Sequence, residues 1–398
     1  MELSQDQKQV HDAIIENKNP LVTIGGYAGT GKTFLISEIR KSLEKLNPKI
    51  YIAFVTFTGK AASVLKQKLG HINKYKHYIG TIHSLIYKPE FHYHEKLHKM
   101  IVTNWIKVEK IGYDIIIIDE ASMISEELMK DLQSYKKPII AVGDHGQLPP
   151  VADSPYNLMK NPDYKLEKIH RQSEGNPIIR LSEIARKYGS IKFGVYNNGI
   201  AKLPRRDNKT MDIFHNINWG EDVIVLCALN KTRVELNNSI RKKLNFDSNV
   251  PYPGERLICL NNNRESGIMN GQTGMLMLLS YETPEILEVC IQMDGVDNIY
   301  NGLIYYPVFG QEQYSEIFSC LKEKGKDFKK ITRNTEFKHI DFFDFGYCIS
   351  VHKSQGSEWK RVVLFEERSY FWDDEYYAKW LYTGLTRAQE KLLLISYD

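Results

Sequence analysis

The stretch LVTIGGYAGTGKTFLISEI, residues 21–39, decides the fold of this chain. Its apolar start, LVTIG, predicts a buried strand, and TFLISEIRKSLEKL has the apolar spacing of a helix. Between them, GYAGTGKT fits the pattern G-x-x-x-x-G-K-[ST] in the strand-loop-helix context that this motif requires. A chance glycine-rich turn is the alternative, which the Lys-Thr ending and both flanking elements disfavour. The stretch predicts a nucleotide-binding α/β fold.

The residues of this loop suit a nucleoside triphosphate. Gly26, Gly29 and Gly31 let the loop curl so that backbone N–H groups and the helix N-terminus face the phosphates. Lys32 would supply positive charge to the β- and γ-phosphates, and the Thr33 hydroxyl would ligate Mg²⁺. ATP and Mg²⁺ are therefore the expected cofactors. The expected nucleotide-binding residues of the loop are Gly26, Gly29, Thr30, Gly31, Lys32 and Thr33.

A second motif, YDIIIIDEAS, would supply the acidic partner of this loop. Its four isoleucines predict a buried strand that delivers Asp119 and Glu120 to the carboxyl end of the sheet, where α/β proteins bind ligands. Asp119 would hold Mg²⁺, and Glu120 would polarise the attacking water. An acidic helix N-cap is the alternative for both carboxylates. The isoleucine strand and the upstream loop favour the catalytic interpretation.

Three further residues are candidates for catalysis. Gln147 in PIIAVGDHGQLPPV follows a predicted strand and is suited to sense the γ-phosphate or orient water, with Asp144 fixing the turn. Arg171 in LEKIHRQ and Arg387 in YTGLTRA lie in suggestive settings, although each alone could be a surface charge. A kinase or a simple nucleotide-binding protein would need only the first two motifs.

Length and composition exclude several classes of protein. At 398 residues the chain predicts two or three domains, since a domain has roughly 100–200 residues. With 42% hydrophobic and 26% charged residues, and no apolar run near the ~18 residues of a membrane helix, it is expected to be soluble and folded. The start, MELSQDQKQV, lacks a secretory signal and predicts an intracellular protein. Five scattered cysteines argue against a disulfide framework or a zinc knuckle.

The net charge of +4 is small, but it is unevenly distributed. Residues 59–112 hold ten lysines, three glutamates and no Asp or Arg, a net charge of +7, which leaves −3 for the remainder. A solvated surface is one interpretation, and a polyanionic partner such as nucleic acid is the other. The lysines are Lys60, Lys66, Lys68, Lys74, Lys76, Lys88, Lys96, Lys99, Lys107 and Lys110.

The pattern along the chain predicts two α/β parts and an insertion. Alternating apolar runs and helical segments fill the first half, and a second such series starts at VIVLCALN, residues 223–230, and resumes at GYCISVHKSQG, residues 346–356. Between residues 251 and 345, short β-like runs are separated by turn signals. The stretch 87–112 has no clear period. A metal site at His92, His94 and His98 is one interpretation of it, and solvated polar residues are the other.

These segments, taken in order, resemble the motifs of a superfamily 1 helicase from Leu3 to Ala388. LSQDQ resembles the Q motif, and GYAGTGKT, FTGKAA, GTIHSL, DEAS, GDHGQLPPV, HRQ with NPII, SVHKSQGSEW and YTGLTRA resemble motifs I, Ia, Ib, II, III, IV, V and VI. Within the superfamily, the chain is similar to the RecD-like branch and especially to compact phage Dda-type helicases. That likeness rests on TGKAA, TIHSL, DEAS, QLPPV, NKTRVELNNSIRKKL, NGQTG and VHKSQG.

The resemblance implies an α/β fold with two RecA-like P-loop NTPase domains, a small 1B pin element and a β-rich, SH3-like 2B insertion. The implied boundaries are 1–85 and 113–172 for domain 1A, 86–112 for 1B, 173–250 and 346–398 for domain 2A, and 251–345 for 2B. ATP would bind between the two RecA-like domains.

The resemblance also implies roles for individual residues. Arg171 and Arg387 would be arginine fingers, and Gln7 would contact adenine. Gly356 and Glu358 would lie near the γ-phosphate and ribose. The implied DNA contacts are Thr58, Gly59, Lys60, Thr81, His83, Ser350, His352 and Lys353. Phe91 and Tyr93 could wedge the first base pair or could equally pack the pin onto its own domain.

The implied function is an ATP-dependent DNA helicase that moves 5′→3′ on single-stranded DNA, in replication or repair. Its implied partners are single-stranded DNA, single-strand/duplex junctions and a single-stranded DNA-binding protein, with no membrane. A monomer would suffice, in the cytoplasm, or in the host cytoplasm for a phage protein. An ATP-gated clamp that remodels bound proteins without unwinding is the main alternative. A P-loop small-molecule kinase would leave motifs Ia, Ib and V unexplained.

Overall fold

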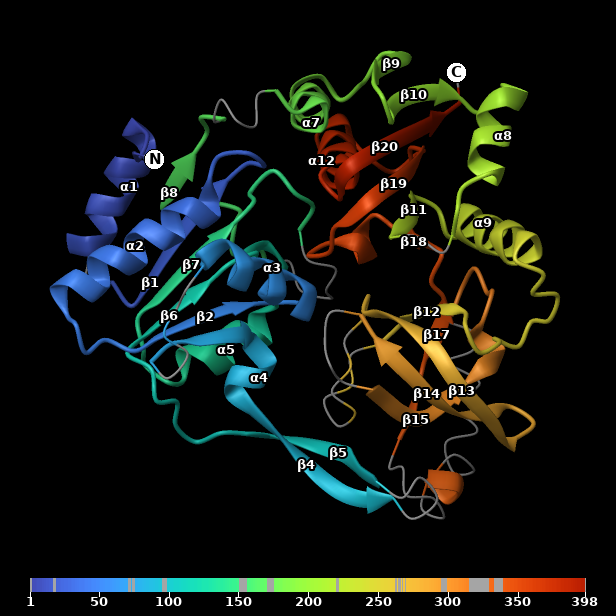
Figure 1. The fold of residues 1–398 in the computed structure, drawn as a ribbon, viewed down its shortest axis with the longest axis horizontal. Coiled ribbons are helices and arrows are strands. Elements are labelled where there is room, and N and C mark those ends of the chain that lie inside the picture. Colours follow the sequence, from blue (N-terminus) through green and yellow to red (C-terminus); the bar gives the residue numbers. More distant parts are fainter. Residues whose placement is uncertain are drawn as a thin grey trace.

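The computed structural model describes most of the chain. Within it, the strands form three six-stranded sheets and one two-stranded hairpin. Figure 1 shows two α/β units side by side and the third sheet next to the second unit. No helix among the described residues is both long and apolar enough to cross a membrane. The described residues are 2–16, 19–70, 73, 76–94, 99–149, 156–169, 175–219, 222–261, 263, 266, 268, 270–294, 299–314, 329–332 and 339–397.

The first sheet is parallel throughout, in the order β3-β2-β6-β7-β1-β8. Helices α1, α2 and α3 pack on one face, and α4, α5 and the 3-10 helix η1 pack on the other. The four strands predicted in this half are confirmed, whereas β3 and β8 were not predicted. The elements are α1 (Gln5–Glu16), β1 (Leu21–Gly26), α2 (Lys32–Leu46), β2 (Ile52–Thr56), α3 (Gly59–Leu69), β3 (Tyr78–Thr81), α4 (Ile82–Ile86), β6 (Ile115–Ile118), η1 (Ala121–Met123), α5 (Glu126–Gln133), β7 (Ile139–Gly143) and β8 (Tyr164–Leu166).

The second sheet has the order β18-β11-β19-β20-β10-β9 and is parallel except for the β9–β10 pair. Helices α7 and α12 cover one face, and α8 and α9 cover the other. The mixed α/β fold with parallel sheets, as predicted, is therefore confirmed. The elements are α7 (Pro177–Tyr188), β9 (Gly194–Asn197), β10 (Ile200–Pro204), α8 (Asn208–His215), β11 (Val223–Cys227), α9 (Asn230–Lys243), β18 (Cys348–Ser350), η3 (His352–Ser354), β19 (Trp359–Glu366), α12 (Asp374–Leu385) and β20 (Ala388–Ser396).

The third sheet interrupts the second unit between α9 and β18, as the turn-rich pattern predicts. Its order is β16-β15-β14-β13-β12-β17, and its pairs are antiparallel except β15–β16. It has its own apolar core, which includes Leu276, Ile291 and Phe343. The elements are β12 (Arg256–Cys259), β13 (Thr273–Thr283), β14 (Ile286–Met293), β15 (Ile299–Tyr305), η2 (Tyr306–Val308), β16 (Ile340–Asp341) and β17 (Phe343–Phe345).

The stretch without a clear sequence period forms an antiparallel hairpin of β4 (Tyr87–His94) and β5 (Lys99–Lys107). It projects away from the first sheet (Figure 1). Its base is fixed to α5, because the Tyr87 hydroxyl and the Lys107 ammonium both bond to the Asp131 carboxylate. The side chains of residues 91–104 lie outside the described part of the structure, as do both positions proposed for a wedge.

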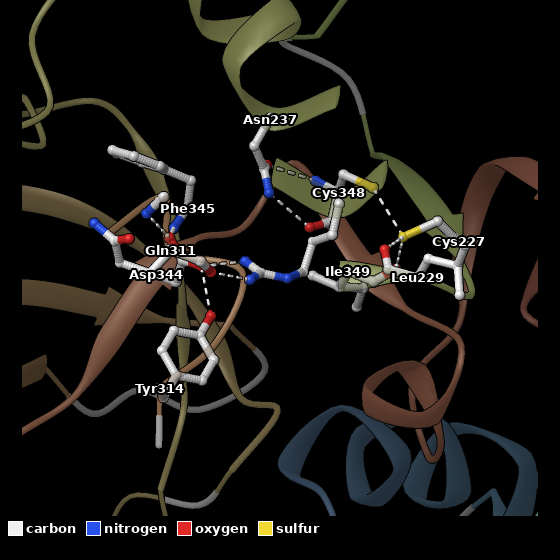
Figure 2. Close-up of polar contacts among 11 residues, drawn as sticks. Cys227, Leu229, Asn237, Gln311, Tyr314, Asp344, Phe345, Cys348 and Ile349 are labelled. Carbon is white, nitrogen blue, oxygen red and sulfur yellow. Dashed lines mark hydrogen bonds and ion pairs between the residues drawn. The ribbon is translucent and has the colours of Figure 1, made fainter. Parts of the chain in front are cut away.

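Helix α9 joins the second unit to the third sheet through three buried polar residues on successive turns, Arg233, Asn237 and Arg241. The Asn237 amide donates to the Cys348 carbonyl oxygen (2.9 Å) and accepts from its N–H (2.9 Å), which extends the ladder of the edge strand β18. Figure 2 shows the two hydrogen bonds between Asn237 and Cys348, and it also shows the buried Asp344 carboxylate.

Two buried ion pairs complete the connection between α9 and the third sheet. Arg233 pairs with Asp344, whose carboxylate also accepts from the Tyr314 hydroxyl (2.8 Å; Figure 2). Arg241 Nε donates to Glu255 Oε1 (2.7 Å), and the Glu255 side chain is fully buried. Removing one partner of such a pair leaves an uncompensated buried charge, so the connection between α9 and the third sheet is expected to be sensitive to substitution at either partner.

The Arg241–Glu255 pair yields a stability prediction. Arg241→Ala should lower the free energy of unfolding by about 3–5 kcal/mol, because Glu255 would remain buried without its counter-charge. Arg256→Ala is the matched control, since its pair with Asp294 is partly exposed and should contribute at most about 1 kcal/mol. Urea denaturation followed by tryptophan fluorescence gives both values. Equal losses in the two variants would contradict a special role for the buried pair.

Candidate functional site

The phosphate loop connects the carboxyl end of β1 to the first residue of α2. Gly29 and Gly31 have φ angles of 80° and 75°, a left-handed region that favours glycine. A Cβ atom on Gly26 would lie 2.7 Å from the Thr30 hydroxyl oxygen, so this position also requires glycine. Thr30 in turn donates to the carbonyl oxygen of Tyr27 (2.8 Å). The loop is therefore curled as the motif predicts.

The Lys32 ammonium is folded onto the loop. It donates to the carbonyl oxygens of Gly26 (2.8 Å) and Tyr27 (3.1 Å). Thr33 follows on the first turn of α2 and is partly buried. An entering phosphate would compete with these carbonyl groups for the lysine, since an ammonium bonds more strongly to an anion than to a neutral oxygen.

Gln7 of α1 lies fully buried against the loop. Its Nε2 donates to the Thr30 carbonyl oxygen (3.0 Å), and its Oε1 accepts from the Ser4 N–H (3.1 Å). The residue expected to contact adenine therefore connects the N-terminal helix to the phosphate loop.

Asp119 and Glu120 lie directly after β6, as predicted. Asp119 Oδ1 accepts from the Glu120 N–H (3.0 Å), and Glu120 has a left-handed φ of 57°, which is unusual for a residue with a side chain. Glu120 Oε2 is buried and has no hydrogen-bond partner in the described part of the chain. This backbone turn directs two carboxylates to one place.

The charged forms of the acidic pair are disfavoured by burial. Burial raises the pKa of Asp119, and the Lys32 charge opposes that shift. Burial, followed by the charge of Asp119, raises the pKa of Glu120 to about 7, while Lys32 and Arg387 lower it. A divalent cation at this place would favour the ionised form of both carboxylates. No cluster of three or more His, Cys, Asp or Glu side chains suited to a metal occurs among the described residues, so such a cation would need ligands from water and phosphate.

The loop after β7 is organised by Asp144, which is 1% exposed. Its carboxylate accepts from the Gly146 N–H (2.9 Å), from Gln147 Nε2 (3.2 Å) and from the Tyr382 hydroxyl (2.6 Å). Gln147 Oε1 is buried and has no hydrogen-bond partner among the residues that the structure describes. Gln147 is thus fixed through its nitrogen while its oxygen stays available.

The second unit contacts this edge of the first sheet at several points. The Leu148 N–H donates to Thr383 Oγ1 (3.0 Å), and the Leu148 carbonyl oxygen accepts from Gln355 Nε2 (2.5 Å). The Thr58 hydroxyl donates to the Gly356 carbonyl oxygen (2.9 Å). Segments quoted above as motifs Ia, III, V and VI therefore meet in one place.

Gly356 lies at the tightest of these contacts. Its φ is +69°, and an added Cβ would collide with the Met123 sulfur and lie 3.4 Å from Thr58 Cγ2. The nearby Glu358 carboxylate accepts from Gln389 Nε2 (3.0 Å). A side chain at position 356 would therefore displace the Met123 side chain of the first unit and strain the backbone at a left-handed φ.

Of the two candidate arginine fingers, only Arg387 lies in the described structure; Arg171 lies outside it. Arg387 is 3% exposed and donates to the carbonyl oxygens of Thr383 (3.0 Å) and Ser357 (3.2 Å). Its charge lowers the pKa of Glu120, so the guanidinium acts on the acidic edge of the first unit.

The expected DNA contacts in the first unit begin helices. Thr58 Oγ1 accepts from the Ala61 N–H (3.2 Å) and caps α3, whose first residue is Gly59. Thr81 caps α4 in the same way, and the ring of His83 lies against Tyr87. The Lys60 side chain is outside the described structure.

The expected DNA contacts of the second unit lie at the end of β18 and directly after it. Ser350 Oγ accepts from the Lys353 N–H (3.3 Å), and His352 Nε2 pairs with the Tyr376 hydroxyl (2.6 Å). Burial, helped by the charge of Arg233, lowers the pKa of Lys353 to about 8. The Ser350 and His352 side chains therefore already make hydrogen bonds within the protein.

Sequence reasoning missed the aromatic contacts across the two units. Tyr27 and Tyr382 both lie inside quoted motifs, GYAGTGKT and YTGLTRA, yet neither was assigned a role. Their rings contact each other edge to face at 6.3 Å. Arg186 of α7 stacks over Tyr27 at 3.7 Å. The position of each tyrosine within a motif was the available signal.

Two family models match the chain. An AAA domain matches residues 2–198, and a UvrD-like helicase C-terminal domain matches residues 345–395. The phosphate loop after β1 and the acidic pair after β6 are the features of a P-loop nucleoside triphosphatase fold. The two family models and the relatives named below are consistent with a helicase of superfamily 1, in the branch of the RecD-like, Pif1 and Dda proteins.

Individual relatives span this branch. The ATP-dependent RecD2 DNA helicase of Deinococcus radiodurans is 25% identical over 98% of this chain. The matched part is only 48% of the length of that relative. The ATP-dependent DNA helicase dda of Enterobacteria phage T4 is 24% identical, with 98% of both chains covered. A solved Pif1 helicase from Bacteroides, in complex with ADP-AlF3 and single-stranded DNA, is 17% identical with a TM-score of 0.48, covering 99% of this chain and 92% of its own.

Gly356 gives a test of the contact between the units. Gly356→Ala should lower the rate of ATP hydrolysis about tenfold or more, because misplacement by about 1 Å costs up to about 10²-fold. Gly189→Ala is the control: Gly189 also has a left-handed φ, of +63°, but an added Cβ there meets nothing closer than 3.9 Å. Both variants carry the same backbone strain. Equal rates of ATP hydrolysis in Gly356→Ala and Gly189→Ala would show that close packing at position 356 does not affect catalysis.

Proposed function

We propose that the chain is an ATP-dependent DNA helicase that translocates on single-stranded DNA and couples Mg-ATP hydrolysis to strand separation. One observation carries the proposal: the Thr58–Gly356 contact joins a segment expected to grip DNA to one expected to sense nucleotide. A change at the nucleotide site would thereby reach the DNA-binding surface.

The nucleotide step would use residues of the first unit. Lys32 would leave the loop carbonyl groups for the β- and γ-phosphates, with Gln7 near adenine. Thr33 and Asp119 would hold Mg²⁺, which when bound neutralises phosphate charge. Glu120 would accept a proton from the water that attacks the γ-phosphorus, while the bond to the β–γ bridging oxygen breaks and ADP leaves. Gln147, held by Asp144, would orient that water.

The second unit would complete the site. Arg387, together with Arg171, would stabilise the charge of the transferring phosphoryl group, a contribution worth about 10³–10⁵ in rate in related enzymes. Gly356 and Glu358 would lie near the γ-phosphate and ribose. ATP would thus be hydrolysed only when the two units are close.

The DNA strand would cross both units. We assign it to the residues that begin α3 and α4 and to those at the end of β18 and directly after it. Single strands are held by basic tracks and stacking faces, and the +7 stretch runs from α3 into the hairpin. The DNA-contact residues proposed are Thr58, Gly59, Lys60, Thr81, His83, Ser350, His352 and Lys353.

The two remaining parts would act on the duplex. The β4–β5 hairpin would be the 1B pin, with Phe91 or Tyr93 as the wedge, and the third sheet would be an SH3-like 2B domain. The proposed domain boundaries follow from these assignments: 1–85 with 113–172, 86–112, 173–250 with 346–398, and 251–345. Travel would be 5′→3′, by analogy with the RecD-like branch, with a monomer as the active unit.

Unwinding of duplexes that carry either a 5′ or a 3′ single-stranded tail tests the proposal. Strand separation with ATP and Mg²⁺ is expected for the 5′-tailed substrate, and Glu120→Gln should abolish it. DNA-stimulated ATP hydrolysis without strand separation would instead indicate an ATP-gated clamp. Hydrolysis that does not respond to DNA would reject both.

Arg387→Ala should separate catalysis from binding. We expect kcat for ATP to fall about 10³-fold or more while nucleotide affinity stays nearly unchanged, because a finger stabilises only the transition state. Turnover in single-turnover assays and binding of a fluorescent ATP analogue measure the two effects. Unchanged turnover would remove Arg387 from the catalytic set.

The basic stretch predicts a salt effect. Lys66→Glu and Lys88→Glu, both at exposed positions, should weaken single-stranded DNA binding and flatten its salt dependence, by about 0.7 in slope for each phosphate that is no longer neutralised. Lys187→Glu on α7 is the control, since it is also exposed but lies outside the stretch. Fluorescence anisotropy at several salt concentrations gives the slopes. Equal slopes in all variants would place the strand elsewhere.

A further inference from the structure

The Tyr382 hydroxyl connects three segments that are far apart in sequence. It accepts from the Ala28 N–H of the phosphate loop (2.8 Å) and donates to Asp144 Oδ2 (2.6 Å). Tyr382 itself belongs to α12 of the second unit, whereas Ala28 and Asp144 belong to the first. A single hydroxyl group thus joins the nucleotide loop, the loop after β7 and the opposite unit.

The chemistry of the three groups fixes the direction of both hydrogen bonds. A backbone N–H can only donate and a carboxylate can only accept, so the phenol proton must point to Asp144. Burial, together with the charge of Asp144, raises the pKa of Tyr382 well above its ordinary value. The group therefore remains a neutral phenol that can serve both partners together.

A second contact supports the same link. The Tyr27 ring, next to Ala28, contacts both the His145 ring, with centroids 4.2 Å apart, and the Arg186 guanidinium, 3.7 Å from its centroid. Arg186 is on α7, which packs against α12 in the same core of the second unit. Two packed helices of the second unit thus hold the start of the phosphate loop.

We propose that Tyr382 is a positioning residue that makes the shape of the nucleotide site depend on the position of the second unit. This inference rests on the proposed ATPase function and deepens it. Tyr382 touches no reacting atom: it acts through the Ala28 amide in the phosphate loop and through Asp144, which holds Gln147. Movement of α12 shifts both loops together, so hydrolysis proceeds only in one arrangement of the units.

Tyr382→Phe removes only the hydroxyl group and tests the link. We expect kcat for ATP in the presence of single-stranded DNA to fall about tenfold to a hundredfold, with KM for ATP changed less than about twofold, since catalysis rather than substrate binding loses its support. Tyr377→Phe is the matched control. Its hydroxyl, also on α12, donates to the carboxylate of Glu366 (2.9 Å) away from the phosphate loop. That variant should keep the wild-type kcat.

A second measurement does not depend on catalysis. Hydrogen–deuterium exchange of the peptide 21–39, without nucleotide, should be faster in Tyr382→Phe, because the Ala28 amide loses its acceptor, and unchanged in Tyr377→Phe. Wild-type-like exchange in Tyr382→Phe would overturn the inference whatever the activity of the chain. If the wild-type protein did not hydrolyse ATP, the proposed function would be rejected. The link between Tyr382 and the phosphate loop would still be tested by the hydrogen–deuterium exchange of the peptide 21–39.

Asp144→Asn provides a third test, of the hydrogen bond between Tyr382 and Asp144. If the two residues act through one hydrogen bond, the double variant with Tyr382→Phe should lose no more kcat than the more impaired single variant. If the fold losses in kcat of the two single variants multiplied in the double variant, the inference would be overturned. A raised KM for ATP at unchanged kcat in Tyr382→Phe would also overturn it. Thermal unfolding midpoints of Tyr382→Phe and Tyr377→Phe should agree, and a fall confined to Tyr382→Phe with kcat retained would indicate a merely structural role.

Discussion

The site depends on one geometric constraint: strands β6, β7 and β1 are adjacent, hydrogen-bonded and parallel. Because parallel strands end at the same edge of a sheet, the phosphate loop, the acidic pair and the loop of Asp144 must meet there. Isoleucine, valine and alanine fill these strands because helices cover both faces. The hydrophobic effect that forms the sheet thus also assembles the polar groups at its edge.

Burial, rather than an excess of negative charge, dominates the electrostatics of this edge. Two buried carboxylates face Lys32 and Arg387, and burial raises the pKa of both acids despite these cations. Bound phosphates would take the lysine away, which increases the need for a divalent cation. Under the proposed function, binding of the nucleotide and of the metal ion and the approach of Arg387 would therefore depend on one another.

The two kinds of junction in the molecule differ in strength. Helix α9 holds the third sheet through buried ion pairs of Arg233 and Arg241, and loss of one partner from such a pair costs about 3–5 kcal/mol. The two α/β units instead meet through hydrogen bonds of Thr58, Leu148 and Tyr382 and through ring contacts of Tyr27, with each neutral hydrogen bond worth about 0.5–1.5 kcal/mol. A second half that can separate from the first agrees with the proposed cycle of opening and closing.

The sequence alone determined the α/β class, strands β1, β2, β6 and β7, the phosphate loop and the acidic pair, because each depends on short-range pattern. It also indicated superfamily 1 of the helicases, because many motifs follow one order, and the family models and relatives are consistent with that. Strands β3, β8, β9 and β10 and the β4–β5 hairpin escaped prediction because they are short or have weak alternation. The roles of Tyr382 and Gly356 in joining the units were decided only by the tertiary structure. Thr58 and Gly356 are 298 residues apart, and Tyr382 is 354 residues from Ala28, so only the packing of two separately formed cores brings them within hydrogen-bonding distance.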